Sequence, residues 1–376
     1  MLDVGALSQD RALEAAGAPV VEAVRRIAAR DLAPIVRDID VDGHYPEAVL
    51  RSFGAAGAYA THLPDVDRGD ADLCTAIGAM AAAGEHCLST AFCMWCQNAL
   101  AWYVFTSDNA ALKDMVGRGA ARGEVLGGTG LSNPMKTFFG IETMRLRASR
   151  VAGGFAVRGA LPWVSNLGPD HYFGAVFEVE DEPRHFVMAI VPCAAAGVKL
   201  VGDHKFVALD GTRTFGVQFR DVFIPDRNVL ADPIEPYLKR IRAGFVLLQA
   251  GMAIGLIRGC IDLMRQTKTS LGHVNKYLEM QPEDLEEKLS DIESTVEQLA
   301  VTPFEPDPSY WRQVIEARLA AGETSVAAAH AAMLHCGARG YVATGAAQRR
   351  LRESYFVAIV TPATKQLRKM LADMPA

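Results

Sequence analysis

Hydrophobic and polar positions change their spacing twice along the 376-residue chain. From residue 10 to about residue 125, apolar side chains recur every three to four positions, as in amphipathic helices. Within residues 22–40, the side chains of Val24, Ile27, Ala28 and Leu32 fall on one helical face before Pro34 disturbs the run. The first zone is therefore predicted to be helical.

Alternation replaces the helical spacing near Leu126. Residues 144–149 alternate apolar and polar side chains, and Gly153-Gly154 then predicts a turn into a second strand. Further strand-like runs cover 172–179, 185–192 and 214–225. Short strands at this spacing are typical of a small antiparallel barrel or sandwich. Helical segments between parallel strands are missing, so a Rossmann sheet is not expected.

Helical spacing returns near residue 235 and continues to the end, with a proline-rich loop predicted at 301–310. Residues 241–266 are apolar on nearly all sides, which predicts burial between other helices or subunits. Together with the later helical runs, they predict a four-helix bundle. The expected class is α+β, mostly α. It comprises an N-terminal helical domain (1–125), a central small antiparallel β-domain (126–232) and a C-terminal four-helix bundle (233–376).

Charge and composition narrow the expected partners. The net charge of −6 and the pI of about 5.9 argue against nucleic acid as the main partner. Residues 1–17 contain early acids and no apolar core run, so we expect no signal peptide. The longest apolar tract, 245–257, is interrupted by Gln249, Gly251 and Gly255, and is predicted to be too short to span a membrane.

Cysteine and histidine usage predicts no metal centre. Seven scattered cysteines suit a reducing cytoplasm. Cys93 and Cys96 have the spacing of a redox or zinc motif, but no second pair accompanies them, and the flanking residues predict a buried helix. We therefore favour core cysteines over a redox function. Three histidines in apolar helices are likewise expected to be structural: His86, His330 and His335.

Several phrases, in order along nearly the whole chain, resemble the acyl-CoA dehydrogenase family. "SNP" (132–134) falls where the family has Thr-Glu-Pro, and "GGFAVRGALPWVSN" (153–166) resembles its Gly-x-x-Tyr-x-x-x-Gly-x-x-x-Trp-Ile-Thr-Asn phrase. "FRDVFIPDRNVL" (219–230) resembles the exit from the β-domain. "CGARGY" (336–341) and "QRRLRE" (348–353) resemble phrases of the last two helices.

The resemblance implies an FAD cofactor. In the family, the Trp-Ile-Thr phrase lies against the isoalloxazine ring, which assigns this contact to Trp163, Val164 and Ser165. A tryptophan supplies a flat apolar wall, and a hydroxyl can meet the polar ring edge. The competing interpretation is a core tryptophan beside a capping serine. The stretch Leu131, Ser132 and Asn133 would meet the pyrimidine edge of the ring.

The same resemblance implies an oligomer. Lys268 stands where the family has an arginine that grips the pyrophosphate of a neighbouring subunit's FAD, and Gln281 could replace the glutamine that follows. Lysine keeps the charge but loses the two-pronged geometry. A homodimer or homotetramer is expected, or a hetero-oligomer with a paralogue. We also expect helix 241–266 to need cover from another chain.

The catalytic base that the resemblance implies is not found in the sequence. Its dehydrogenases use a glutamate to remove a proton next to a thioester. Pro362 falls about where that glutamate should be, and Phe245 falls near the alternative position. Glu353 matches a structural aspartate of the family. The family's Gly-Ser-Asp phrase is also replaced, by "MKTFFGIE" (135–142). The catalytic residue is therefore unknown.

Three functions stay open at this point. The first, which we favour, is an FAD-dependent oxidoreductase acting on the CH–CH bond of an acyl thioester, such as an acyl-CoA, or a similar small molecule. The second is a flavin-dependent monooxygenase of the same fold, which does not need the glutamate. The third is a non-catalytic subunit that has kept the fold.

Overall fold

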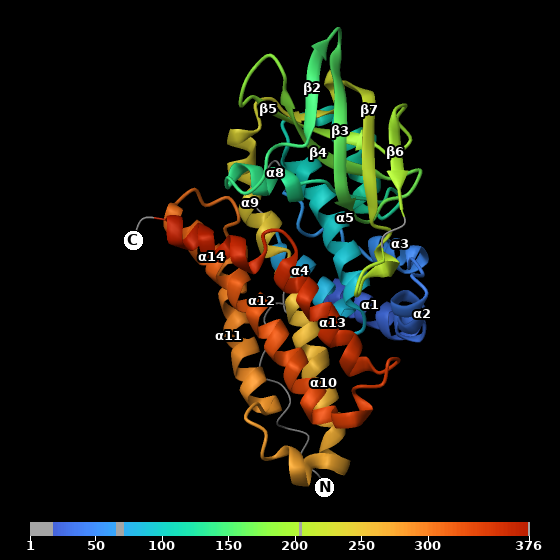
Figure 1. Ribbon diagram of the computed structural model, residues 1–376, viewed down its shortest axis with the longest axis vertical. Coiled ribbons are helices and arrows are strands. Elements are labelled where there is room, and N and C mark those ends of the chain that lie inside the picture. Colours follow the sequence, from blue (N-terminus) through green and yellow to red (C-terminus); the bar gives the residue numbers. More distant parts are fainter. Residues whose placement is uncertain (1–17, 65–70, 203–204, 375–376) are drawn as a thin grey trace.

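A computed structural model describes residues 18–64, 71–202 and 205–374. It shows a sheet at one end, long helices at the other, and N-terminal helices packed beside both (Figure 1). This arrangement confirms the predicted α+β class. The expectation of no signal peptide concerns residues 1–17, which lie outside the described residues.

The first helical run is interrupted where Pro34 lies. A π-helical turn at Ala28–Leu32 and a 3-10 turn at Ala33–Ile35 separate α1 from α2. The predicted apolar face is confirmed, since Val24, Ala28 and Leu32 are fully buried and Ile27 is partly buried. The N-terminal helices are α1 (Ala18–Ile27), α2 (Val36–Val41), α3 (Glu47–Ala55), α4 (Leu73–Gly84), α5 (Leu88–Thr106), α6 (Ala110–Leu112) and α7 (Arg118–Ala121).

The central sheet has the order β6-β7-β3-β2-β4-β5-β8, with β1 beside β4. Its strands are β1 (Gly127–Thr129), β2 (Leu146–Val151), β3 (Gly154–Val164), β4 (Tyr172–Val179), β5 (Phe186–Pro192), β6 (Val198–Val201), β7 (Phe215–Pro225) and β8 (Val229–Ala231). The predicted hairpin at Gly153-Gly154 joins β2 to β3. Most pairs are antiparallel as predicted, while β4 pairs in parallel with β1 and β2.

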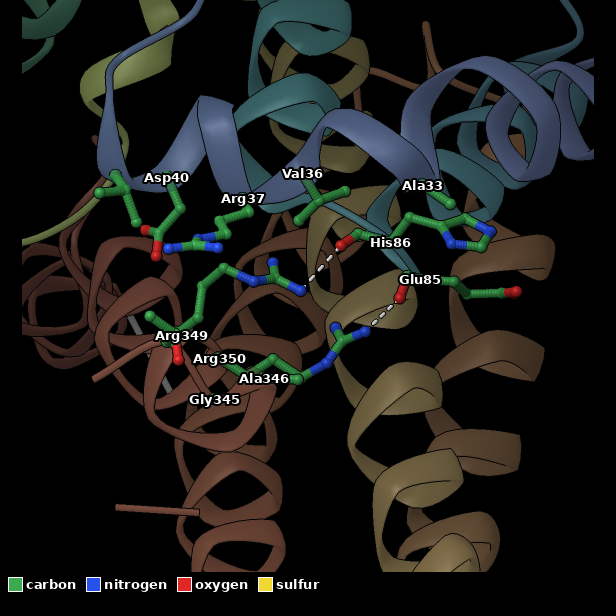
Figure 2. A pocket seen from close by; sticks show the side chains of 12 residues that line it. Ala33, Val36, Arg37, Asp40, Glu85, His86, Gly345, Ala346, Arg349 and Arg350 are labelled. Atoms are coloured by element: carbon green, nitrogen blue, oxygen red, sulfur yellow. Dashed lines mark hydrogen bonds between the residues drawn. The ribbon is translucent and has the colours of Figure 1, made fainter. Parts of the chain in front are cut away.

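The remaining helices are α8 (Ser132–Phe138), α9 (Glu235–Leu247), α10 (Ala250–Asn275), α11 (Pro282–Ala300), α12 (Pro308–Cys336), α13 (Ala346–Ile359) and α14 (Thr364–Asp373). Helices α10 to α13 pack against one another as a bundle. Helix α13 also faces the N-terminal helices. There Arg349 and Arg350 extend toward the turn between α4 and α5, and donate hydrogen bonds to the carbonyls of His86 and Glu85 (Figure 2).

The apolar segment 241–266 is mostly buried between other helices, as predicted, but it is not one continuous helix. The chain breaks it at Leu248-Gln249, between α9 and α10. By length and composition, the segment Glu235–Asn275 could cross a membrane, because an 18-residue window within it has a mean hydropathy of 1.7. That window is entirely buried inside the protein. The expected need for cover from another subunit is wrong for residues 250–261, because helices of the same chain bury them completely.

Candidate functional site

A cavity of about 540 Å³ lies between the sheet and helices α5, α9 and α13. We call it the central cavity. Its volume is in the range of small-molecule sites. Aromatic side chains make much of its wall: Phe92, Trp95, Trp163, Phe206, Phe245, Tyr355 and Phe356.

The end of β3 supplies one wall. Trp163 and Ser165 line the cavity, whereas Val164 between them is 1% exposed and belongs to the core of the sheet. This follows from strand geometry, in which alternate side chains point to opposite faces. Trp163 is 56% exposed, and its ring lies 6.3 Å from that of Phe206.

Asn166 holds this strand end in place. Its backbone is left-handed, with a φ of 62°, a conformation that asparagine tolerates better than most residues. The fully buried side chain donates to the carbonyl of Gly127 at 2.7 Å and accepts from the hydroxyl of Tyr45 at 2.7 Å. The chain therefore turns sharply directly after Ser165, and the orientation of Ser165 is fixed from both sides.

Gly128 allows β1 to approach the same turn. A Cβ atom at this position would lie 2.1 Å from the carbonyl oxygen of Ser165. Only a glycine fits such a contact without backbone movement.

Hydroxyl groups in the wall form one chain of three and one pair. Ser165 Oγ lies 2.6 Å from Thr214 Oγ1, which lies 2.8 Å from Thr212 Oγ1. Ser132 Oγ lies 2.9 Å from Thr361 Oγ1, a residue 229 positions away. Arg213, between the two threonines, has a left-handed backbone with a φ of 44°. Such strained positions often accompany functional sites. None of the three threonines was predicted from the sequence.

Three of the eight predicted cofactor contacts meet at the cavity: Ser132, Trp163 and Ser165. Leu131, Asn133 and Val164 lie beneath the surface and are 1 to 3% exposed. The side chain of Asn133 accepts from the Arg145 amide at 3.0 Å and donates to the Thr143 carbonyl at 2.9 Å, which is a supporting role.

Lys268 and Gln281 do not line the central cavity. Lys268 lies on α10, and Gln281 caps the start of α11 while its amide donates to the carbonyls of Asn275 and Leu278. The predicted contact was with a neighbouring subunit's cofactor, so for these two residues it stays a prediction.

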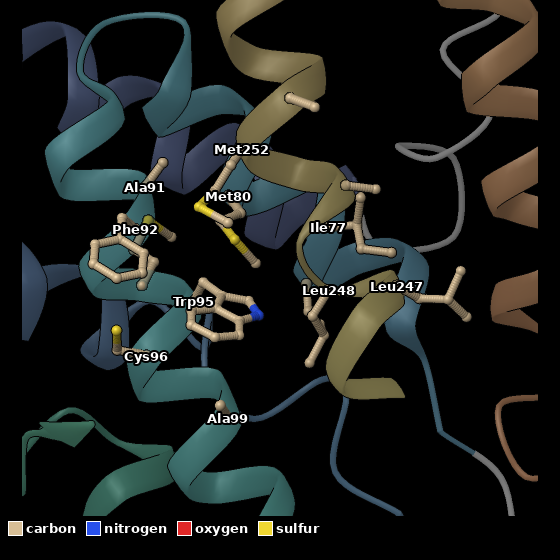
Figure 3. Close-up of a cluster of buried hydrophobic side chains, with 14 of the residues drawn as sticks. Ile77, Met80, Ala91, Phe92, Trp95, Cys96, Ala99, Leu247, Leu248 and Met252 are labelled. Carbon is tan, nitrogen blue, oxygen red and sulfur yellow. The ribbon is translucent and has the colours of Figure 1, made fainter. Parts of the chain in front are cut away.

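Trp95 closes the inner end of the cavity. Its Nε1–H donates to the carbonyl of Phe245 at 3.2 Å, and the two rings lie 5.0 Å apart. Figure 3 shows Trp95 extending from α5 toward Met80, Leu248 and Met252. Those three side chains are fully buried, so the cavity ends against packed core.

Comparison with known proteins shows what this chain is similar to. The model of the "Acyl-CoA dehydrogenase, N-terminal domain" matches residues 18–124. A probable acyl-CoA dehydrogenase of Bacillus subtilis, YngJ, is 22% identical over 90% of this chain and 92% of its own. Butyryl-CoA dehydrogenase from Megasphaera elsdenii superposes with a TM-score of 0.83 at 15% identity, over 97% of this chain and 98% of that one.

The chain has the fold of the acyl-CoA dehydrogenases, and its residues 18–124 match the family's N-terminal domain. A glutaryl-CoA dehydrogenase from Mycobacterium smegmatis, solved in complex with FADH2, has the same fold. Its TM-score is 0.75 at 17% identity, over 98% of this chain and 96% of that one.

The described lining of the central cavity lacks the carboxylate that the family resemblance would imply. Among the described residues that line the central cavity there is no aspartate or glutamate. Phe245 lies in the wall as expected, and Thr361, not Pro362, reaches the cavity. Glu353 is 1% exposed and pairs with Arg349 at 2.8 Å, which agrees with its expected structural role.

The ionisable groups at the cavity do not replace a carboxylate base. Burial raises the pKa of the Cys96 thiol far above its usual value, so it stays protonated. Lys136 pairs with Glu142 at 3.0 Å, and Arg352 pairs with Asp40 at 2.6 Å. Cys93 and Cys96 are free and buried, which confirms the prediction of core cysteines.

A buried positive charge lies behind the Thr361 side of the wall. Gln249 Nε2 donates to the carbonyl of Thr361 at 2.9 Å, and Gln249 Oε1 accepts from Arg318 Nε at 2.7 Å. Arg318 is 3% exposed, and burial lowers its pKa to about 10, so it stays charged at neutral pH. This part of the cavity therefore favours negative charge on a ligand.

The described residues contain no cluster of three or more His, Cys, Asp or Glu that could hold a metal ion. His335 is buried and bonds through Nε2 to the carbonyl of Met280 at 2.9 Å, the structural role that its sequence context predicts.

Proposed function

We propose that the protein is an FAD-dependent oxidoreductase that oxidises the CH–CH bond of an acyl thioester or similar small substrate. Its relatives are named acyl-CoA dehydrogenases, and one solved neighbour contains FADH2. The observation that carries the proposal is the wall at the end of β3, where an exposed tryptophan and an oriented serine hydroxyl face a cavity of about 540 Å³.

The cavity fits the ring system of a flavin. Trp163 presents a flat apolar surface, and Ser132 and Ser165 place hydroxyl groups where a ring edge can accept or donate hydrogen bonds. FAD, when bound, supplies the acceptor for a hydride. The chain supplies the orientation of the ring, aromatic walls and the positive charge of Arg318.

Removal of the substrate proton is the step that this cavity supports least. No lining carboxylate is available to take it, and the nearby hydroxyls are weak bases. The positive charge of Arg318 would stabilise an enolate-like anion at the Thr361 side of the wall. We therefore propose a substrate whose proton is already acidic.

A visible spectrum of the purified protein is the first test. We expect the absorption of a bound flavin, or its appearance when FAD is added. Anaerobic mixing with a series of acyl-CoA substrates should then bleach the flavin, most strongly for those with an acidified α-proton. A protein that stays colourless with excess FAD would contradict the proposal and favour a non-catalytic subunit.

The carboxylate-free lining also favours a second candidate, a flavin-dependent monooxygenase. Such an enzyme activates oxygen on reduced flavin and needs no base of this kind. It would consume oxygen only when reduced flavin is supplied, and acyl-CoA would not bleach its flavin under anaerobic conditions. The two mixing experiments therefore separate the two candidates.

We further propose that the chain assembles as a homodimer or homotetramer, in which Lys268 and Gln281 reach the pyrophosphate of a neighbour's FAD. Light scattering should give two or four times the chain mass of 40.5 kDa. The variant Lys268→Met should weaken FAD binding without changing this mass. Unchanged FAD affinity would remove Lys268 from the cofactor site.

A further inference from the structure

A second cavity, of about 330 Å³, lies where the start of α13 faces α2 and the turn between α4 and α5. We call it the arginine cavity, because Arg37, Arg349 and Arg350 line it (Figure 2). It shares no lining residue with the central cavity. The proposed oxidoreductase activity gives it no role.

The N-terminus of α13 opens into this cavity. Thr344, Gly345 and Ala346 line it, and the helix begins at Ala346. The residue before the helix is a glycine, and no side chain caps the helix start. The first amides of a helix have no partner within the helix, and together with the helix dipole they attract anions. A 14-residue helix thus presents its uncapped positive end to the cavity.

Arg350 is a second, independent feature that points to an anion site. It is 6% exposed, and its Nε and Nη1 atoms have no hydrogen-bond partner within the described part of the chain. Buried donors of this kind are almost always paired in folded proteins. A guanidinium cannot lose its charge to relieve the deficit. Its Nη2 atom donates to the carbonyl of Glu85, so the side chain is held in place at the wall.

The charges around the cavity do not cancel. The lining carboxylates are already held, Asp40 by Arg352 at 2.6 Å and Glu85 by Arg25 and Arg258 at 3.2 and 3.3 Å. Arg349 is balanced by Glu353 at 2.8 Å. Arg37 is exposed and makes no ion pair with a described residue. Neither Arg37 nor Arg350 therefore forms an ion pair with a described residue.

His86 also lines the cavity. Burial lowers the pKa of its imidazole; the charge of Glu85 opposes this shift, and the charges of Arg350, Arg25 and Arg349 add to it.

We propose that the arginine cavity binds a phosphate group, either inorganic phosphate or that of a small phosphate monoester. Three groups line it: the first amides of α13, the buried guanidinium of Arg350 and the exposed guanidinium of Arg37. Amides at a helix start and arginine side chains are the groups that bind phosphate in proteins. The volume leaves room for a small body beyond the phosphate.

The experiment is a titration of the purified protein with inorganic phosphate and, separately, with AMP, at constant ionic strength. Calorimetry and the melting temperature measure binding, and ¹H–¹⁵N spectra follow His86. Constant ionic strength is needed because salt screens weak charge effects. We expect saturable binding, a higher melting temperature and a raised pKa of His86. Tighter binding of AMP would identify an ester, and equal affinity would identify the phosphate alone.

Ala346→Pro is the sharpest variant. It removes one helix-start amide, and proline is well tolerated at the first helical position. The preceding Gly345 already has the φ of −76° and ψ of 146° that a residue before proline prefers. Helices α11 and α12 of this protein begin with Pro282 and Pro308. We expect at least tenfold weaker phosphate binding with little change in the melting temperature of the ligand-free protein.

Arg37→Gln should weaken binding at least tenfold, and Arg350→Met should abolish it. The matched control is Arg368→Gln, which removes an exposed arginine of α14 paired with Glu323 at 2.5 Å and should leave phosphate binding unchanged. If Arg350→Met does not fold, the two surface variants still decide. The proposal is overturned if phosphate binding is not saturable, or if Ala346→Pro and Arg37→Gln bind phosphate as the parent protein does.

Discussion

The two cavities lie toward opposite ends of α13 and are built on different principles. At the central cavity, the hydroxyls of Ser132, Ser165 and Thr214 are each paired with another hydroxyl, and aromatic rings make up much of the rest. At the arginine cavity, three arginines line the wall, and the Nε and Nη1 donors of Arg350 have no hydrogen-bond partner among the described residues. The first cavity suits a flat ligand with little charge, and the second suits a compact anion.

The sequence of α13 explains the contrast. Its first half carries Arg349, Arg350 and Arg352, and its second half carries Tyr355 and Phe356. One helix thus supplies guanidinium groups to one cavity and aromatic rings to the other. Arg352 connects the two cavities. Its side chain lines the central cavity and pairs with Asp40, which lines the arginine cavity.

The largest effect is expected from Glu353→Gln, which removes the only carboxylate paired with Arg349 in the described structure. Breaking a buried ion pair leaves an uncompensated charge and costs about 3 to 5 kcal/mol. Urea denaturation should show this loss of unfolding free energy. In Glu323→Gln, which breaks the exposed pair with Arg368, the loss should stay below about 1 kcal/mol. Equal losses in the two variants would contradict the buried network.

Gly128→Ala should damage the central cavity alone. The new Cβ would meet the carbonyl of Ser165 at 2.1 Å, so β1 or the strand end must move. We expect a loss of about 1 to 3 kcal/mol in unfolding free energy and weaker FAD binding. Gly272→Ala in α10 is the control, because its nearest neighbour, Lys268 Cγ, is 3.6 Å away. That variant should gain up to about 1 kcal/mol.

Ser165→Ala should be milder. It removes one hydroxyl pair, worth about 1 kcal/mol, and should shift the flavin spectrum or slow flavin reduction. Ser149→Ala also removes one hydroxyl bond, 2.9 Å long, to Glu180 on the outside of the sheet. It should lose similar stability with no spectral change. If both variants leave the spectrum unchanged, Ser165 does not contact the flavin.

The smallest effect concerns pH and the arginine cavity. The pKa of His86 is lowered on folding from 6.5, so the unfolded chain binds more protons below that pH. Its contribution to stability is therefore complete above pH 6.5 and is lost as the pH falls. Comparing unfolding at pH 7 and pH 5.5, we expect His86→Gln to lose less stability than the parent protein. Added phosphate should reduce the difference between the two proteins.

The sequence predicted those site residues whose position depends on residues next to them in the chain. Alternation along β3 was visible in the sequence, and with the family resemblance it placed Trp163 and Ser165 on one wall. Thr361 was missed because its partner, Ser132, is 229 residues away. Thr212 and Thr214 were missed because the left-handed backbone of Arg213 that presents them leaves no mark in composition.

Tertiary contacts also explain the break between α9 and α10. The break falls at Leu248 and Gln249, and neither is a proline or a glycine, so the spacing of apolar residues alone predicts one continuous helix. The side chain of Gln249 instead bonds to the carbonyl of Thr361 and to Arg318. The same limit applies to the arginine cavity, since Arg37 and Ala346 come together only when α2 and α13 pack.

Trp95 gives the central cavity a fixed depth. Because its ring rests against fully buried side chains of α4 and α10, any mutation that deepens the cavity also removes packing from the main core. Truncating a buried tryptophan costs about 3 to 5 kcal/mol. Evolution toward longer ligands would therefore require compensating stabilisation elsewhere. The depth of the central cavity is thus coupled to the stability of the whole chain.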